Sequence, residues 1–261
     1  MTVKEFYGVL NEYAPKALSD EYCASFGAYD NSGVLVDTGK AVKKALFSLD
    51  LSVGAIEKAK AVGANLIVTH HPAIYSPVKR LEGKLVDCIA AGISVISMHL
   101  NLDAAVGGID ESLAVAVALA SGKDGANKET VMHPLSQGGY GRAYEVKTAT
   151  LQELCEGLKR VLGTQKLWAF GDDGKQIKKA ASFCGAGVDE GAIAFAKAQG
   201  ADVVISADWK HHLIALTIEE GMAAVALTHY ASEAYGFKKY YEKISQRGEV
   251  SCVYHEDAEM L

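Results

Sequence analysis

An internal duplication constrains the fold of this 261-residue chain more than any other feature of its sequence. Residues 51–69 (LSVGAIEKAKAVGANLIVT) and 188–206 (VDEGAIAFAKAQGADVVIS) are identical at eight of nineteen positions, at a constant offset of 137. Each copy has apolar residues at helical spacing, then a glycine suited to a left-handed helix end (Gly63 or Gly200), then a short β-branched run. The repeated helix–strand unit predicts an α/β protein built from two related halves.

Each half continues with a strand-like run that ends in histidine and is followed, four residues later, by a carboxylate. Residues 92–99 (GISVISMH) lead to Asp103, and residues 221–229 (GMAAVALTH) lead to Glu233. Functional side chains in α/β proteins gather at the carboxyl ends of strands. We therefore expect each half to supply a histidine and a carboxylate to one site.

The segment 121–128 (SGKDGANK) is the best candidate for a linker between the halves. The expected architecture is two pseudo-symmetric α/β subdomains, residues 1–122 and 123–261, which flank a metal-binding cleft and form one functional unit. The remaining elements predicted from apolar spacing are helices at 3–20, 111–121 (with Asp110 as its N-cap), 150–162 and about 232–245, and a strand at 140–148.

Two adjacent histidines, His70 and His71, directly follow the apolar run 64–69 and precede Pro72. Two imidazoles at the end of a strand can reach one point, and the proline prevents the strand from continuing. A single histidine at such a place is usually a hydrogen-bonded structural residue, and the pair alone leaves the two interpretations evenly balanced. The duplicated strand ends favour a metal site, although the offset of 137 places Asp208, not a histidine, opposite His71.

The candidate ligands are three imidazoles and two carboxylates: His70, His71, Asp103, His229 and Glu233. Five such groups exceed a closed tetrahedral zinc site and suit two divalent ions that share a carboxylate. Nitrogen and oxygen ligands are compatible with Zn, Mn, Fe, Co or Ni, and the sequence does not choose among them. His99 and Asp208 are the expected catalytic residues, because they can orient ligands or move protons.

Composition and missing motifs exclude several other classes of function. The net charge of −6 and the pI near 5.8 disfavour nucleic acid and membrane surfaces as partners. Five scattered cysteines and the absence of an apolar leader favour reduced thiols and a cytoplasmic location. Neither a phosphate-binding glycine loop nor a serine nucleophile elbow is present.

Several stretches together resemble the GTP cyclohydrolase I type 2 homologue family, also called the Nif-three-like family. They are Asp30-Asn31-Ser32-Gly33, Thr69-His70-His71-Pro72, His99 to Ala105 (HLNLDAA) with Gly107-Gly108, Gly139-Tyr140-Gly141-Arg142, and His229-Tyr230-Ala231-Ser232-Glu233. The resemblance implies a Nif-three-like fold, a dinuclear metal site with the same five ligands, and a toroidal homohexamer. It covers most of the chain, and the short linker leaves no room for the inserted domain of longer relatives.

Three departures from the family pattern affect residues around the ligands. Thr228 stands where a glycine is usual, Leu100 where a threonine is common, and Ser206-Ala207-Asp208 where Thr-Gly-Asp or Thr-Gly-Glu is usual. None of them removes an expected ligand, but they alter the lining of the site.

The leading hypothesis is a metal-dependent hydrolase of a nucleotide or related heterocycle, of the GTP cyclohydrolase type. In that reaction a water activated by the two metals attacks C8 of the purine, and His99 or Asp208 moves protons. The alternative is a hexameric metal-binding scaffold or metal carrier without enzymatic activity. Phosphoester or nucleic-acid hydrolysis is a third hypothesis, which the acidic net charge disfavours.

Overall fold

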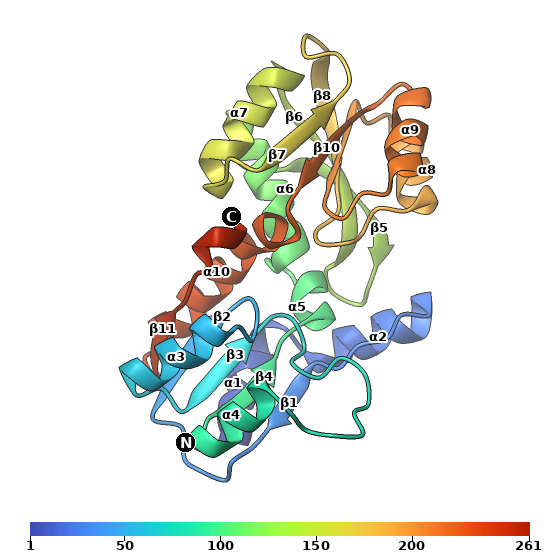
Figure 1. The fold of residues 1–261 in the computed structure, drawn as a ribbon. Helices are drawn as coiled ribbons and strands as arrows, with labels where there is room; N and C mark the ends of the chain where they lie inside the picture. Colours follow the sequence, from blue (N-terminus) through green and yellow to red (C-terminus); the bar gives the residue numbers. More distant parts are fainter. The chain divides into compact units, whose positions relative to one another are not determined.

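Two separate β-sheets organise the chain, and each belongs to its own compact unit (Figure 1). The structure, a computed structural model, describes residues 1–261. Unit 1 comprises residues 1–108 and 237–259, and unit 2 comprises residues 109–236 and 260–261.

The unit boundary differs from the one expected between residues 122 and 123. The chain leaves unit 1 before α6 (Ile109–Ala120), because this helix packs against α7 (Leu151–Leu162) and β6 (Gly139–Thr150) of unit 2. It returns to unit 1 at residue 237, inside α10 (His229–Arg247). A chain-order division misses this return, because the last helix contributes to both units.

Unit 1 is a five-stranded sheet with the order β1-β4-β3-β2-β11, in which only the edge strand β1 is antiparallel. The strands are β1 (Gly33–Val36), β2 (Lys44–Ser48), β3 (Leu66–Thr69), β4 (Ser94–Ser97) and β11 (Ser251–Tyr254). The helices are α1 (Val3–Tyr13), α2 (Lys16–Phe26), α3 (Val53–Val62), α4 (Lys84–Ala91) and α5 (Leu100–Ala104). The expected single helix at 3–20 is wrong: Pro15 divides it, because proline restricts the residue before it and cannot donate a helical hydrogen bond.

Unit 2 is a six-stranded sheet with the order β5-β6-β8-β9-β10-β7. Its other strands are β5 (Asn127–Pro134), β7 (Leu167–Phe170), β8 (Gln176–Ser182), β9 (Val203–Ser206) and β10 (Ala223–Leu227). Its other helices are α8 (Glu190–Ala198) and α9 (His211–Glu219), and a 3-10 turn (Ala258–Met260) lies near the end of the chain. Strands β8, β9 and β10 are parallel, and β7 is antiparallel at the edge.

The two sheets share one topology, which confirms the duplication predicted from the sequence. The order β1-β4-β3-β2 in unit 1 has the same chain order and directions as β7-β10-β9-β8 in unit 2. Helices α3 and α4 pack with their strands as α8 and α9 do with theirs. Gly63 and Gly200, the matched helix stops, have φ angles of 69° and 71°.

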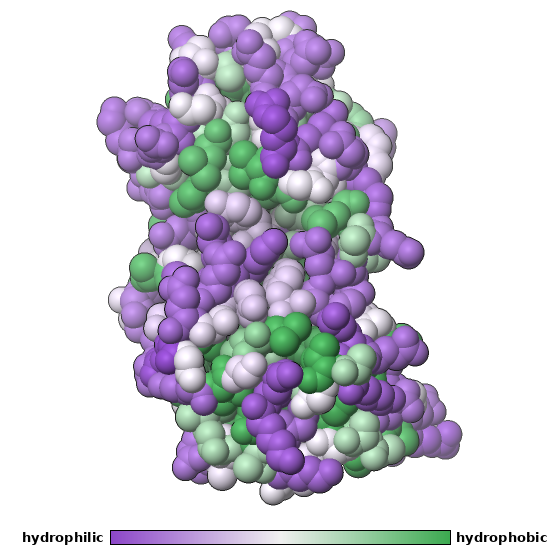
Figure 2. Space-filling model, turned by 90° about the vertical axis from the view of Figure 1, so that its left-hand side faces the viewer, coloured by the Kyte–Doolittle hydropathy of each residue, from purple (hydrophilic) through white to green (hydrophobic).

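The central parallel strands of both sheets are buried throughout. In unit 1, Leu46 and Ile67 pack under α3 and α4, whereas Phe47 contacts Phe237 of α10. Neighbouring strand residues thus point to opposite faces, as the pleat requires. No helix has the length and apolar character needed to cross a membrane. On the face that Figure 2 shows, hydrophilic residues are interspersed with smaller apolar areas, as on most globular proteins.

Candidate metal centre

Unit 1 brings four of the expected site residues together at the carboxyl ends of β3 and β4. His70 and His71 follow β3, His99 follows β4, and Asp103 lies in α5. The two strands are parallel neighbours with Thr69 opposite Ser97, so their ends lie at one edge of the sheet. His70 is fully buried, and Asp103 is 5% exposed.

The distances among these side chains are short enough for shared ligation. His70 Nε2 lies 3.5 Å from Asp103 Oδ1. The ring centre of His70 is 4.8 Å from that of His71 and 5.2 Å from that of His99. One ligand atom each from His70, His99 and Asp103 lie within 4.8 Å of one another. His99, expected to act in catalysis, therefore lies as close to this cluster as the expected ligands do.

His70, His71 and His99, the three histidines of this cluster, are each held at Nδ1 by an acceptor. His70 Nδ1 donates to the carbonyl oxygen of Met98 at 2.8 Å, which requires the proton to be on Nδ1. His71 and His99 make 2.8 Å hydrogen bonds to the carboxylates of Asp50 and Asp30. In a neutral imidazole with Nδ1 protonated, the Nε2 lone pair is available to a metal ion.

The carboxylate of Asp30 is well suited to hold His99. Its side chain is 1% exposed and accepts hydrogen bonds from His99, the Ser19 hydroxyl and the backbone N–H of Ser32. Burial alone would raise the pKa of Asp30, but these hydrogen bonds outweigh burial and hold that pKa well below its usual value. Asp30 therefore stays ionised and keeps the His99 ring oriented.

Unit 2 contributes a second histidine–carboxylate pair from the first turns of α10. His229 begins this helix directly after the loop from β10, and Glu233 lies four residues later on the same face. His229 Nε2 is 3.1 Å from Glu233 Oε1, while His229 Nδ1 is 2.6 Å from Asp208 Oδ2. Glu233 is 3% exposed. Asp208, which follows β9 with a φ of 51°, thus orients the His229 ring from the side away from Glu233.

The geometry of both units fits a metal cation. In each unit, an imidazole Nε2 whose ring is held at Nδ1 faces a carboxylate oxygen, at 3.5 Å in unit 1 and 3.1 Å in unit 2. Two acceptors so close repel each other unless a proton or a metal cation lies between them. Imidazole nitrogen with carboxylate oxygen is the donor set of a divalent transition-metal site. The residues present therefore fit the expected metal ions.

Sequence reasoning missed three residues of these clusters. Asp30 is named from the sequence only within the Asp30-Asn31-Ser32-Gly33 stretch of the family resemblance, and Asp50, two residues after β2, has no role there. Their positions at the same sheet edge as His71 and His99 were the available clue. Cys184, two residues after β8, has its sulfur within 4.8 Å of a Glu233 carboxylate oxygen. It is buried, and the sequence distinguishes it in no way from the other four scattered cysteines.

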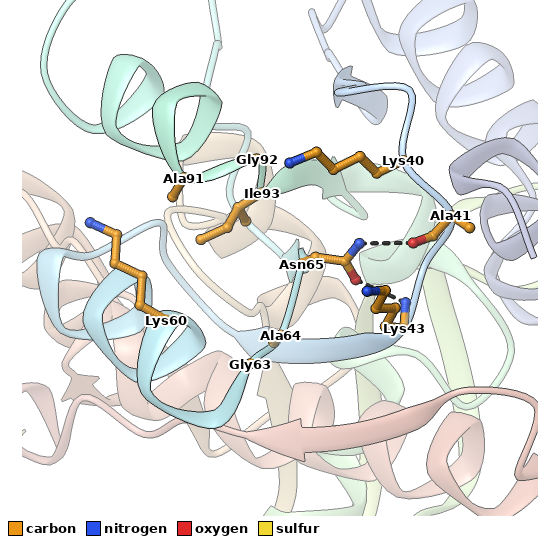
Figure 3. Close-up of a pocket in the computed structure, with 10 residues that line it drawn as sticks. All are labelled: Lys40, Ala41, Lys43, Lys60, Gly63, Ala64, Asn65, Ala91, Gly92 and Ile93. Carbon is orange, nitrogen blue, oxygen red and sulfur yellow. Dashed lines mark hydrogen bonds between the residues drawn. The ribbon is translucent and has the colours of Figure 1, made fainter.

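Two hollows lie at opposite ends of the parallel strands of unit 1. One, of about 240 Å³, is lined by His71 and Asp50 together with Glu82 and Lys84. The other, of about 570 Å³, lies where the parallel strands begin, and its lining contains no histidine or carboxylate (Figure 3). Its lysines, among them Lys40 beside the C-terminal end of α4, lie where a helix dipole favours positive charge. The smaller hollow is therefore the one adjacent to the candidate ligands.

Comparisons with known proteins agree with the motifs. The sequence profile of the Duf34/NIF3 (NGG1p interacting factor 3) family matches residues 1–258. A Clostridium perfringens protein named GTP cyclohydrolase 1 type 2 homolog is 31% identical over 258 residues, covering 95% of this chain and 92% of that protein. A Helicobacter pylori protein named GTP cyclohydrolase 1 type 2 is 29% identical over 242 residues, covering 88% and 86%.

Solved structures show the same fold. A Bacillus cereus protein related to NIF3 superposes with a TM-score of 0.81 at 18% identity, covering 98% of this chain and 97% of that one. The family profile matches nearly the whole chain, and one relative is more than 30% identical to it. Together these two findings establish the family. This chain belongs to the Duf34/NIF3 family, as its motifs predicted.

Proposed function

We propose that this protein binds two divalent metal ions and hydrolyses a nucleotide or related heterocycle. The observation that carries the proposal is the common arrangement of its histidines. His70, His71, His99 and His229 are each held at Nδ1, and two of them face a carboxylate through Nε2. Acceptors at Nδ1 are the usual support of histidines that bind metal ions.

The proposed ligands are divided between the two units. His70, His71 and Asp103 would hold the metals from unit 1, and His229 and Glu233 from unit 2. When bound, the metal ions would supply Lewis acidity and lower the pKa of a coordinated water. His99, oriented by the ionised Asp30, is the residue we assign to hold or transfer a proton at its Nε2. Asp208 fixes the ring of His229.

The class of substrate is suggested by the relatives and by the hollow beside His71. The Clostridium perfringens and Helicobacter pylori proteins carry cyclohydrolase names, which favour a purine-like ring. The hollow offers one cationic side chain, Lys84, against the carboxylates of Asp50 and Glu82. This balance favours a ligand with fewer negative charges than a nucleoside triphosphate.

Metal analysis of the purified protein together with a screen of nucleotides and free heterocycles tests the proposal. We expect about two divalent ions per chain and turnover of a purine-type compound. The double variant His70→Ala with Glu233→Ala removes one ligand from each unit and should abolish both. Retained turnover in that variant would disprove the mechanism. Bound metal in the wild type without any turnover would favour the metal carrier or scaffold instead.

We also propose a homohexamer located in the cytoplasm. Exposed apolar side chains on the loop after β3 and on α4 support assembly: Tyr75 50%, Val78 52%, Leu81 55%, Val86 43% and Ile89 45% exposed. None of the five cysteines forms a disulfide, which supports a reducing compartment. Light scattering coupled to gel filtration would measure the mass of the assembly, and a monomeric mass would contradict the hexamer.

A further inference from the structure

The turn formed by Cys184 and Gly185 lies directly against the ligand atoms of unit 2. Gly185 follows β8 and has a φ of 55°, a left-handed conformation that favours glycine. A β-carbon built on Gly185 would lie 2.4 Å from Glu233 Oε1 and 3.2 Å from His229 Nε2. The absence of a side chain therefore lets the backbone of the turn lie directly beside both ligand atoms, without displacing them.

Both polar groups of the Cys184 peptide backbone are fixed by side chains that come from outside the turn. The N–H of Cys184 donates to Asp110 Oδ1 at 3.4 Å, and its carbonyl oxygen accepts from the Tyr140 hydroxyl at 2.5 Å. Tyr140 belongs to the Gly-Tyr-Gly-Arg stretch, which sequence reasoning used only for the family resemblance. In the structure, the tyrosine of that stretch holds the carbonyl oxygen of Cys184 in place.

The backbone N–H and carbonyl groups of Gly185 are also held by hydrogen bonds. Its N–H donates to the Ser232 hydroxyl at 3.0 Å, and Ser232 in turn donates to the carbonyl oxygen of His229 at 2.7 Å. The carbonyl oxygen of Gly185 accepts from the N–H of Ala207 at 3.2 Å. The turn is thus bonded to the start of α10 and to the loop that carries Asp208.

Asp110 itself is anchored in the interior of unit 2. It is fully buried and accepts hydrogen bonds from the Arg142 guanidinium at 2.8 Å and from the N–H of Gly141 at 3.0 Å. The expectation that Asp110 caps a helix is wrong: α6 begins at Ile109, and the Asp110 carboxylate points to this network. Removing either partner of a buried ion pair leaves an unpaired charge, so these two residues are poor test sites.

We propose that the Cys184–Gly185 turn is a positioning element that keeps His229 Nε2 and Glu233 Oε1 accessible and fixed for a metal ion, with Tyr140 as its positioning residue. This inference rests on the proposed metal-binding function and gives Cys184, Gly185 and Tyr140 a role that neither the motifs nor the family assignment gives them. It requires that two changes impair metal binding: filling the space at Gly185, and releasing the Cys184 carbonyl.

The first test compares Gly185→Ala with Gly200→Ala, measured by calorimetric titration of the full-length protein with Zn²⁺. Both glycines have positive φ, so both substitutions strain the backbone and lower the Tm. Nothing lies within 4 Å of a β-carbon at Gly200, whereas the one at Gly185 meets the ligands. We expect Gly185→Ala to weaken Zn²⁺ binding by about 100-fold and Gly200→Ala to leave it unchanged.

The second test compares two tyrosines of the same strand and does not depend on a glycine substitution. Tyr140→Phe removes the hydrogen bond to the turn, whereas Tyr144→Phe removes a 2.9 Å hydrogen bond to the hydroxyl of Ser182. We expect Tyr140→Phe to weaken Zn²⁺ binding by about 10-fold, with the affinity of Tyr144→Phe equal to that of the wild type. Both variants lose one hydroxyl, so a general loss of stability would affect them alike.

The outcomes separate this inference from the proposed function. If the wild-type protein binds no Zn²⁺, the proposed function fails and the inference fails with it. If the wild type binds Zn²⁺ and Tyr140→Phe or a folded Gly185→Ala variant binds it equally well, only the inference is overturned. Equal losses in the matched controls would also overturn it, because the effect would then come from general destabilisation.

Discussion

At the scale of single residues, the candidate centre depends on which nitrogen of each histidine carries the proton. Four histidines use Nδ1 for a carbonyl or carboxylate partner, which leaves Nε2 for ligation. The sequence indicated the histidines, because adjacent imidazoles and repeated strand ends are visible in it. It did not indicate Asp30 or Asp50, because a hydrogen bond between residues 69 or 21 positions apart leaves no periodic trace.

Asp208→Asn tests the importance of the proton position at His229. The asparagine tolerates the same left-handed backbone, so the substitution does not strain the chain. Its amide can donate to Nδ1 and would then favour the imidazole that is protonated at Nε2, which cannot bind metal. We expect Zn²⁺ affinity to fall about 10- to 100-fold. Asp172→Asn, at an exposed turn, is the matched control, and an unchanged affinity in Asp208→Asn would contradict the assigned role.

Asp30 predicts a pH dependence of stability. Its folded-state pKa lies below the unfolded value of about 4, so the stability it contributes is complete above that value and decreases as the pH falls below it. Chemical unfolding of metal-free protein should therefore show a decrease in unfolding free energy from pH 5 to pH 3. The decrease should be smaller in Asp30→Asn, since the other carboxylates are the same in both proteins. An identical decrease in the two proteins would show that Asp30 is not responsible.

At the scale of elements, the sequence predicted what local patterns determine. The helix stops at Gly63 and Gly200 and the helix near 150–162 were predicted, and α7 indeed begins after the capping residue Thr150. The role of Asp110 was not, because its partner Arg142 lies 32 positions away on another element. Local pattern thus determines these helix ends, and tertiary partners decide what the polar residues do.

The C-terminal part of α10 gives a testable contribution at this scale. Phe237 is fully buried in unit 1, with its ring centre 6.2 Å from that of Phe47 and 6.3 Å from that of His70. Phe237→Ala should lower the free energy of unfolding by about 3–5 kcal/mol, because a large cavity replaces the ring. Phe170→Ala, at a 38% exposed position on an edge strand, should cost less than about 1.5 kcal/mol. Denaturant titration of both variants measures the difference, and equal losses would argue against this packing role.

At the scale of the whole molecule, the duplication has diverged in chemistry while the topology has remained. In each sheet, the strand that pairs with the antiparallel edge strand is followed by a histidine. His99 follows β4 in unit 1, and His229 follows β10 in unit 2. Only unit 1 adds a pair of histidines after its central strand, whereas unit 2 has Ala207 and Asp208 there. The proposed function therefore needs ligands from both units, since neither copy alone carries all five.

That division predicts coupling between substitutions in different units. Asp103→Ala in unit 1 and Glu233→Ala in unit 2 each remove a carboxylate that faces a histidine Nε2. If ligands from both units act on the same ions, the first substitution should remove most of the Zn²⁺ affinity, and the second should then cost little more. A double-mutant cycle on binding free energies would show a coupling of about 1–3 kcal/mol. Independent binding by each unit would instead give additive losses, with about half the metal retained in each single variant, and the five residues would then not form one dinuclear centre.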